Sequence, residues 1–207
     1  MATKKSTESK VTVFSDYICP FCFIGKSSID KLQKEFDVDV EWKNMEIHPE
    51  TPKNGVSVSQ IDPSFFKQMW ENVERLAKQS GIKINPPPIM SNSNLAIISS
   101  EYARQENMFE AFHDAVFRAY WQEGKNIGDL KVIIEIAKTI GLDTSKLKEY
   151  IIEGAWKDNI NKQSQSAQNH QVSGVPTFVI GKETIIGAQP YNIIKETYSK
   201  AANLSKP

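Results

Sequence analysis

Cys19 and Cys22 are the only cysteines in this chain of 207 residues, and two residues separate them. Thiols this close in sequence cannot tie distant segments together, so they do not form a structural disulfide framework. Their spacing suits redox chemistry, because the free N–H groups and the macrodipole of a helix's first turn favour a thiolate. We expect Cys19 to be the exposed nucleophile. Cys22, deeper in the helix, would resolve the mixed disulfide that Cys19 forms.

The same pair could supply two of the four ligands of a structural zinc site. The other two would have to come from His48, His113 and His170, which are not spaced as a pair of ligands. We therefore expect no metal. His48 precedes Pro49 and is expected in an ordered turn, whereas His113 and His170 are expected to face solvent or to make local hydrogen bonds.

A second element, Ser173–Phe178, places Val175-Pro176 at the start of a predicted strand. A proline inside a strand removes a ladder hydrogen bond, but the first residue of a strand can accommodate it, often after a cis peptide bond. With the cysteine pair upstream, we expect a cis Val175–Pro176 bond beside Cys19, which leaves the backbone of Val175 free to pair with an extended substrate. The predicted substrate-binding residues are therefore Pro20, Phe21, Val175 and Pro176.

The elements that must position these residues are two β-containing ends around a helical centre. Residue patterns predict a strand at 11–17, a helix at 23–36 and a strand at 38–42. The far end predicts a hairpin at 177–186 and a helix that starts at Pro190. The centre shows no internal repeat, and its predicted helices are at 63–80, 94–106, 108–122, 129–140, 145–153 and 155–170.

Composition gives little reason to expect a charged partner. Hydrophobic residues make up 40% of the chain and charged residues 24%, and 25 basic residues balance 25 acidic ones. Such a balance does not favour binding to nucleic acid or to a membrane surface. No apolar run is long enough for a secretory signal or a membrane span. With Met1 as the native start, we expect a cytoplasmic protein.

The segment Ser15–Lys26, which contains Cys19-Pro20-Phe21-Cys22, resembles the active-site signature of the FrnE-like oxidoreductases of the DsbA family. Further motifs extend the resemblance over nearly the whole chain beyond residue 10: Glu46–Pro49, Asn92-Ser93 with Ala96, Ala115–Tyr120, Glu123–Ile127 and Gly174–Phe178. The resemblance implies an α/β thioredoxin fold with an inserted all-helical domain. It also implies thiol–disulfide exchange without a bound cofactor, on disulfide- or thiol-containing proteins or on small thiols such as glutathione.

This resemblance divides the chain into domains. Residues 11–47 and 171–207 would form a discontinuous thioredoxin-like domain, residues 48–154 a helical insertion, and residues 155–170 a connecting helix. Residues 1–10 are polar and are expected to be disordered. A homodimer remains open as a further partnership.

The same superfamily includes 2-hydroxychromene-2-carboxylate isomerases and kappa-class glutathione transferases, which typically have serine where Cys19 stands. A glutathione-dependent isomerase or transferase is therefore the alternative function. In that case Asn92 could contact a small thiol ligand, although a helix N-cap is its simpler role. A third interpretation is a chaperone-like binding module whose apolar groove acts without thiols. The presence of both cysteines favours redox chemistry.

Two departures from the periplasmic DsbA oxidants bear on the chemistry. Phe21 stands where those proteins have a histidine that helps to hold the thiolate, so we expect a less oxidising couple. Val13 stands where they have a buried acid for proton transfer. Asp16 or Glu46 could substitute, although such acids are more often found in turns or at the surface.

Aromatic side chains form the last set of candidates. Phe21 should be exposed between the cysteines and could form an apolar groove for extended polypeptide with Phe23, Tyr120 and Trp121. The helical stripes that hold three other large rings are instead typical of core: Trp70, Phe112 and Trp156.

Overall fold

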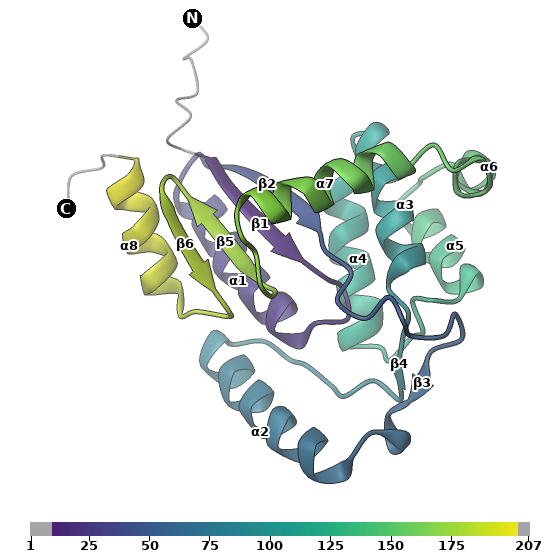
Figure 1. Cartoon of the computed structure of the whole chain (residues 1–207), viewed down its shortest axis with the longest axis horizontal. Coiled ribbons are helices and arrows are strands. Elements are labelled where there is room, and N and C mark those ends of the chain that lie inside the picture. Colours follow the sequence, from purple (N-terminus) through teal and green to yellow (C-terminus); the bar gives the residue numbers. More distant parts are fainter. Residues whose placement is uncertain (1–9, 203–207) are drawn as a thin grey trace, which may run out of the picture.

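The strand that precedes the cysteines lies inside a four-stranded sheet. The computed structural model describes residues 10–202, and the sheet has the order β2-β1-β5-β6. β1 (Lys10–Ser15) pairs in parallel with β2 (Asp39–Asn44) and antiparallel with β5 (Thr177–Ile180), which pairs antiparallel with β6 (Glu183–Ile186). The predicted β-α-β and β-β-α ends therefore form one sheet (Figure 1).

The predicted disorder of residues 1–10 falls mostly outside the described residues. Lys10 is the exception, and there the prediction is wrong. It opens β1 opposite Asp39, and its ammonium lies 2.9 Å from Glu41 Oε2. The neighbouring strand orders this polar residue, which its own sequence context could not indicate.

One face of the sheet carries α1 (Pro20–Glu35) and α8 (Tyr191–Ala201). Alternate side chains of a strand share a face, and the hydrophobic cluster on this face includes Val11, Val13, Ile29, Leu32, Phe178, Ile180, Ile194 and Tyr198. Phe14, next to Val13, instead has its ring 5.7 Å from the ring of His170 at the end of α7 (Lys157–Asn169). Both faces of β1 are therefore covered.

The predicted connecting helix is α7, which crosses the sheet on the side of β2 (Figure 1). Lys43 Nζ donates to Ser166 Oγ at 2.7 Å, and the N–H of Asn44 donates to Gln163 Oε1 at 2.6 Å. These bonds occupy donors at the outer strand of the sheet, where an uncovered edge would invite pairing with other chains.

The insertion between β2 and α7 supplies most of the remaining helices. They are α2 (Pro63–Ser80), α3 (Asn94–Gln105), α4 (Phe109–Trp121), α5 (Leu130–Thr139) and α6 (Thr144–Glu153). Helices α3 to α6 share one hydrophobic cluster, in which Phe112, Val116, Ile133 and Leu147 are fully buried. Within residues 10–202, no helix combines the length and the apolar character that crossing a membrane would require.

The sequence predicted an all-helical insertion, and this prediction is wrong. β3 (Val56–Ser57) and β4 (Ile89–Met90) form a two-stranded antiparallel ladder. Gly55 makes their approach feasible, because its φ is +77° and a Cβ at this position would lie 2.4 Å from Ile89 Cγ2. Strands of two residues are too short to show periodicity, so the pattern could not reveal them.

Helix α2 stands apart from α3 to α6 and packs on α1 (Figure 1). Val73 and Ala77 are buried against Ile24 of α1. Gly81, with a φ of 74°, follows α2 directly where the helix predicted at 63–80 ends. This packing uses the second half of α2, so its first half, which contains Phe66–Trp70, extends beside the start of α1.

Candidate active site

Cys19 is the N-cap residue of α1, just after β1 has ended. Pro20 follows at the first helical position, where its missing N–H leaves no bond unmade. The carbonyl oxygen of Cys19 accepts from the N–H of Cys22 at 3.1 Å and from that of Phe23 at 3.3 Å. Cys19 therefore lies at the positive end of the helix macrodipole, where negative charge is stabilised.

The loop before β5 brings Val175 to Cys19 although 156 positions separate them in the chain. The thiol of Cys19 donates to the carbonyl oxygen of Val175, with 3.6 Å between sulfur and oxygen. The Val175–Pro176 peptide bond is cis. Gly187 N–H donates to the carbonyl oxygen of Pro176 at 2.8 Å, so the segment after β6 holds this loop in place.

Cys19 is not the exposed nucleophile that the sequence predicted. It exposes 5% of its surface and Cys22 exposes 1%, and both are free thiols. The insertion causes this burial, because its side chains close over the start of α1. Cys19 nevertheless forms part of a cavity wall, whereas Cys22 does not. The cavity therefore adjoins the first cysteine of the pair but not the second.

Burial raises the pKa of Cys22 well above the usual value for a thiol, and the hydrogen bond and charge of Cys19 raise it further. Cys22 is therefore protonated at neutral pH. Its interaction with Cys19 places the two sulfurs close together. A protonated thiol beneath the reactive one suits a resolving residue, which acts only after Cys19 has formed a mixed disulfide.

Asp16 is buried with 1% exposure, so it is not the surface acid that its type suggests. Its carboxylate accepts from the N–H of Ile47 at 2.8 Å and of Ile18 at 3.2 Å. Burial raises the pKa of Asp16 to about 6, although these two backbone hydrogen bonds oppose the rise. Asp16 thus ties the turn before Cys19 to the segment that follows β2.

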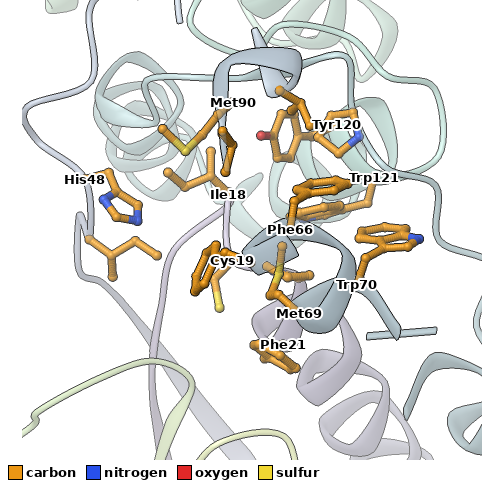
Figure 2. A pocket seen from close by; sticks show the side chains of 16 residues that line it. Ile18, Cys19, Phe21, His48, Phe66, Met69, Trp70, Met90, Tyr120 and Trp121 are labelled. Carbon is orange, nitrogen blue, oxygen red and sulfur yellow. The ribbon is translucent and has the colours of Figure 1, made fainter. Parts of the chain in front are cut away.

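A cavity of about 230 Å³ lies beside Cys19 and is lined almost entirely by apolar side chains (Figure 2). The insertion provides most of this wall, with Phe66, Met69 and Trp70 from α2, Met90 from β4, and Tyr120 and Trp121 from α4. In Figure 2 His48 lies on the side opposite Trp70 and Trp121. Trp121 Nε1 donates to the carbonyl oxygen of Tyr17 at 2.8 Å, which joins α4 to the turn before Cys19.

The predicted substrate-binding residues fall into two groups. Pro20 and Phe21 line the cavity, and Phe21 is half-buried rather than exposed. Val175 meets the Cys19 sulfur but, like Pro176, does not line the cavity. The structure therefore surrounds Cys19 with a polar backbone contact on one side and apolar space on another.

The predicted aromatic groove is correct only in part. Tyr120 and Trp121 line the cavity with Phe21, but Phe23 does not. Phe23 instead stacks on Phe117 at 5.6 Å between ring centroids. Helical periodicity explains the difference, since Phe21 and Phe23 point to different sides of α1.

Trp70 packs against the hydrophobic core, as its helical stripe predicts, but its ring is only half-buried. It lines the cavity, with its ring centroid 6.5 Å from that of Trp121. Phe112 is fully buried and Trp156 packs against the same cluster, as predicted. Periodicity identifies the inward side of α2, but it cannot tell whether that side meets protein or a cavity. Met90, on the two-residue strand β4, gave no sequence signal at all.

Asn92, the candidate contact to a small thiol, does not line the cavity. Its Nδ2 donates to the carbonyl oxygen of Thr51 at 2.7 Å, and its Oδ1 accepts from the N–H of Asn94 at 3.0 Å. Both ends of its amide are thus bonded within the chain, just before α3, whose N-cap is Ser93. A role in ligand binding stays a prediction.

His48 lies in an ordered turn, as predicted, in which its carbonyl oxygen accepts from the N–H of Thr51 at 3.1 Å. Its imidazole also lines the cavity, and Nδ1 lies 2.8 Å from Glu50 Oε1. The sequence did not indicate this second property, because the distance from His48 to the cysteines depends on how the insertion folds back.

His113 corrects the prediction that it faces solvent. It exposes 1% of its surface, and its Nδ1 lies 3.1 Å from the hydroxyl of Tyr17. Burial lowers the pKa of His113 well below its usual value, and the charges of Lys26 and Arg104 lower it further. His170 does make the predicted local hydrogen bond, at 2.8 Å to the carbonyl oxygen of its helix neighbour Ser166.

Comparison with known proteins agrees with this geometry. Residues 10–199 match the family model of the DSBA-like thioredoxin domain. The uncharacterized protein YwbO of Bacillus subtilis is 32% identical over 194 residues, which cover 91% of this chain and 95% of YwbO. The 2-hydroxychromene-2-carboxylate isomerase of Pseudomonas putida is 22% identical over 181 residues, which cover 84% of this chain and 86% of the isomerase.

A solved structure shares the fold. The probable DsbA oxidoreductase SCO1869 of Streptomyces coelicolor superposes with a TM-score of 0.81 at 22% identity, over 96% of this chain and 92% of that chain. The α/β thioredoxin-like fold with inserted helices is therefore common to both. Together with the match over residues 10–199, this means that the chain belongs to the DSBA-like thioredoxin domain family.

Proposed function

We propose that this protein is a thiol–disulfide oxidoreductase in which Cys19 is the nucleophile and Cys22 the resolving thiol. The observation that carries the proposal is the position of the Cys19 sulfur. It lies at the start of α1, 3.6 Å from the carbonyl oxygen of Val175 and in the wall of a cavity. A purely structural cysteine would need no such access. Membership of the DSBA-like family supports the same chemistry.

The proposed reaction transfers two electrons. The thiolate of Cys19 attacks one sulfur of a substrate disulfide, and the other substrate sulfur leaves as a thiolate. Cys22 then loses its proton and attacks the Cys19 sulfur, which forms the Cys19–Cys22 disulfide and releases the rest of the substrate as a second thiolate. The protein is oxidised and the substrate reduced; the same steps in reverse oxidise a dithiol substrate.

Val175 has a proposed part in binding. Its carbonyl oxygen accepts from the Cys19 thiol in the free protein. When Cys19 forms a bond to substrate, that hydrogen bond is lost and the carbonyl oxygen becomes available to a substrate N–H. A backbone acceptor of this kind would orient an extended substrate without regard to its side chains.

A second candidate is a glutathione-dependent isomerase acting on a small aromatic compound. The aromatic lining of the cavity favours it, as does the relative named 2-hydroxychromene-2-carboxylate isomerase. Such a reaction would use the thiol of bound glutathione and would not need exchange between two protein cysteines. It should therefore survive the loss of Cys22.

Single substitutions of the two cysteines test the proposal. Cys19→Ser should abolish the reduction of insulin disulfides, because a serine hydroxyl forms no mixed disulfide. Cys22→Ser should accumulate a mixed disulfide on Cys19, seen as added mass under non-reducing conditions. Lys34→Ala, at the exposed far end of α1, serves as the matched control and should exchange disulfides like the wild type.

Two outcomes would redirect the assignment. Full insulin reduction by Cys19→Ser would contradict the nucleophile. Saturable glutathione binding, with isomerase activity that persists in Cys22→Ser, would favour the second candidate.

A further inference from the structure

The cavity beside Cys19 has no formally charged side chain in its wall. Among the described residues that line it there is no aspartate, glutamate, lysine or arginine. His48 is the one residue of the lining that could become a cation, and its Nδ1 is already paired with Glu50 at 2.8 Å. The hydroxyl of Tyr120 is also engaged, since it donates to the carbonyl oxygen of Ile89 at 3.2 Å. The wall therefore offers little that could compensate a charged ligand.

The wall opposite His48 is a run of aromatic rings. Phe66 and Trp70 are stacked with 6.0 Å between ring centroids and 3° between their planes. Trp70 and Trp121 are 6.5 Å apart at 21°, and Trp121 meets Tyr120 edge to face at 4.7 Å. Met69 adds a polarizable thioether, which makes favourable contacts with aromatic groups. This surface suits an aromatic guest.

The volume of the cavity limits the class of ligand that it can hold. The cavity measures about 230 Å³, and an apolar protein cavity of about 150 Å³ is already large enough to hold benzene. One aromatic ring with a short linker to sulfur therefore fits. A glutathionyl group is larger, and its two carboxylates and its ammonium group would lose hydration without gaining partners.

Taking the proposed exchange chemistry as given, we propose that the cavity selects low-molecular-weight disulfides with an uncharged aromatic half. The ring occupies the space between His48 and Trp70, and the attached sulfur faces Cys19. Charged thiols such as glutathione are disfavoured as substrates. The insertion thus supplies selectivity to a reaction carried out at the start of α1.

The first step balances without any further reactant. Cys19 forms a bond to the sulfur that carries the aromatic group, the substrate S–S bond breaks, and the other half leaves with the electron pair as a thiolate. Cys22 then displaces the aromatic thiolate. One reduced protein therefore reduces one disulfide, and a dithiol such as dithiothreitol restores the protein between turnovers.

Three reagents with one leaving group isolate the contribution of the cavity. Benzyl, 2-sulfonatoethyl and 2-(trimethylammonio)ethyl methanethiosulfonate each transfer their thio group to a thiolate and release methanesulfinate. For each reagent we would measure the rate at which the reduced full-length protein loses its free thiols, since Cys22 displaces the group that Cys19 takes up. That rate is divided by the rate of the same reagent with free 2-mercaptoethanol. Burial of one ring predicts a normalised preference for the benzyl reagent of about 10- to 100-fold over both charged reagents.

A charge placed in the wall provides the matched variant. Met69→Lys should raise the normalised rate of the sulfonate reagent and lower that of the benzyl reagent, because it puts an ammonium inside the cavity. Gln68→Lys adds the same charge to the neighbouring exposed position of α2, outside the lining. It should leave the benzyl preference in place, which separates a local contact from long-range attraction. The wild-type series does not depend on either variant folding.

The outcomes distinguish the two proposals. Equal normalised rates for the three reagents, or a preference for a charged one, would overturn the selectivity while leaving the exchange function intact. Insulin disulfides that react faster than the benzyl reagent, after the same normalisation, would assign the cavity to polypeptide and overturn the small-molecule proposal. No modification of Cys19 by any reagent would overturn the proposed function and, with it, this inference.

Discussion

Cys19 meets mainly backbone groups on one side and mainly side chains on the other. On the thioredoxin-like side, the start of α1 and the carbonyl oxygen of Val175 present backbone groups to the sulfur. On the insertion side, Trp70, Trp121 and Met69 present rings and a thioether. Backbone groups have the same chemistry whatever residue carries them, whereas side chains can vary. Under the proposed function, the first side would set reactivity and the second would set which substrates enter.

The buried ionisable side chains repeat this contrast. Asp16, on the thioredoxin-like side, accepts two backbone N–H groups. His113, on α4, lies among rings, with 4.5 Å to Trp42 and 4.8 Å to Phe117 between centroids. Its Nε2 is buried without a hydrogen-bond partner in the part of the chain that the structure describes. One region satisfies its carboxylate through the backbone, whereas the other gives a partner to only one of the two imidazole nitrogens.

Among the variants that test this comparison, Asp16→Asn should show the largest change in the free energy of unfolding. Burial raises the pKa of Asp16 from 3.8 to about 6, so the folded protein binds this proton more tightly than the unfolded chain does. The resulting stabilisation is complete below pH 3.8 and is lost as the pH rises through 6, which amounts to about 3 kcal/mol. The Asp16→Asn variant lacks this pH-dependent stabilisation. The difference in free energy of unfolding between wild type and variant should therefore change by about 2 kcal/mol between about pH 4 and pH 7.

Urea titrations at several pH values measure this difference. The variant also loses an acceptor for one backbone N–H, which costs about 1–3 kcal/mol at every pH. The pH-dependent part is therefore the informative one, and a difference that stays constant with pH would show that the Asp16 carboxyl does not titrate as described.

His113→Phe should give the next largest effect, with the opposite sign. The folded-state pKa of His113 lies well below 6.5, so the unfolded chain takes up a proton that the folded protein does not. Stability is full above pH 6.5 and falls as the pH drops below it, with a limiting slope of about 1.4 kcal/mol per pH unit. Phenylalanine removes this loss, while the hydroxyl of Tyr17 loses its partner at every pH.

The two slopes oppose each other in the wild type between about pH 4 and pH 6.5. Each variant should therefore uncover the slope of the other residue: falling stability with rising pH in His113→Phe, and rising stability in Asp16→Asn. An unchanged slope in His113→Phe would mean that another group controls stability in this range.

Gly25→Ala should give the smallest effect and act only on the reactive side. An added Cβ would lie 2.9 Å from Phe178 Cζ and 3.3 Å from Pro176 Cγ. Overpacking costs about 1–3 kcal/mol, and the better helix propensity of alanine returns up to about 1 kcal/mol, so a net loss of about 1 kcal/mol is expected. Because Pro176 follows the residue that contacts Cys19, the rate of disulfide exchange should fall while the benzyl preference stays unchanged.

Gly174→Ala is the matched control, since a Cβ there would meet nothing within 4 Å. Chemical denaturation and the thiosulfonate series measure both variants. A changed benzyl preference in Gly25→Ala would break the division between reactivity and selectivity that the two sides of Cys19 suggest.

Local patterns predicted most of the architecture. The helices predicted at 63–80 and 145–153 and the hairpin predicted at 177–186 all agree with the structure. Each depends on residues within one or two turns of one another, so type and spacing suffice. The two-residue strands β3 and β4 could not be found this way, because no period fits in two residues.

The site was predicted less completely than the fold. Cys19, Cys22 and Val175 carry sequence signals, because redox spacing and a strand-start proline are local features. The burial of Cys19 and Asp16 and the place of Trp70 carry none, because each depends on which distant segment packs nearby.

By itself, the sequence determined which pair of thiols is a candidate for redox chemistry and which of the longer segments become helix or strand, since both follow from residue type and short spacing. The tertiary structure alone decided what surrounds the first sulfur: the carbonyl oxygen of Val175 on one side and the rings of α2 and α4 on the other. These partners come from segments far apart in the chain. Their meeting depends on packing over the whole fold, which no local pattern records.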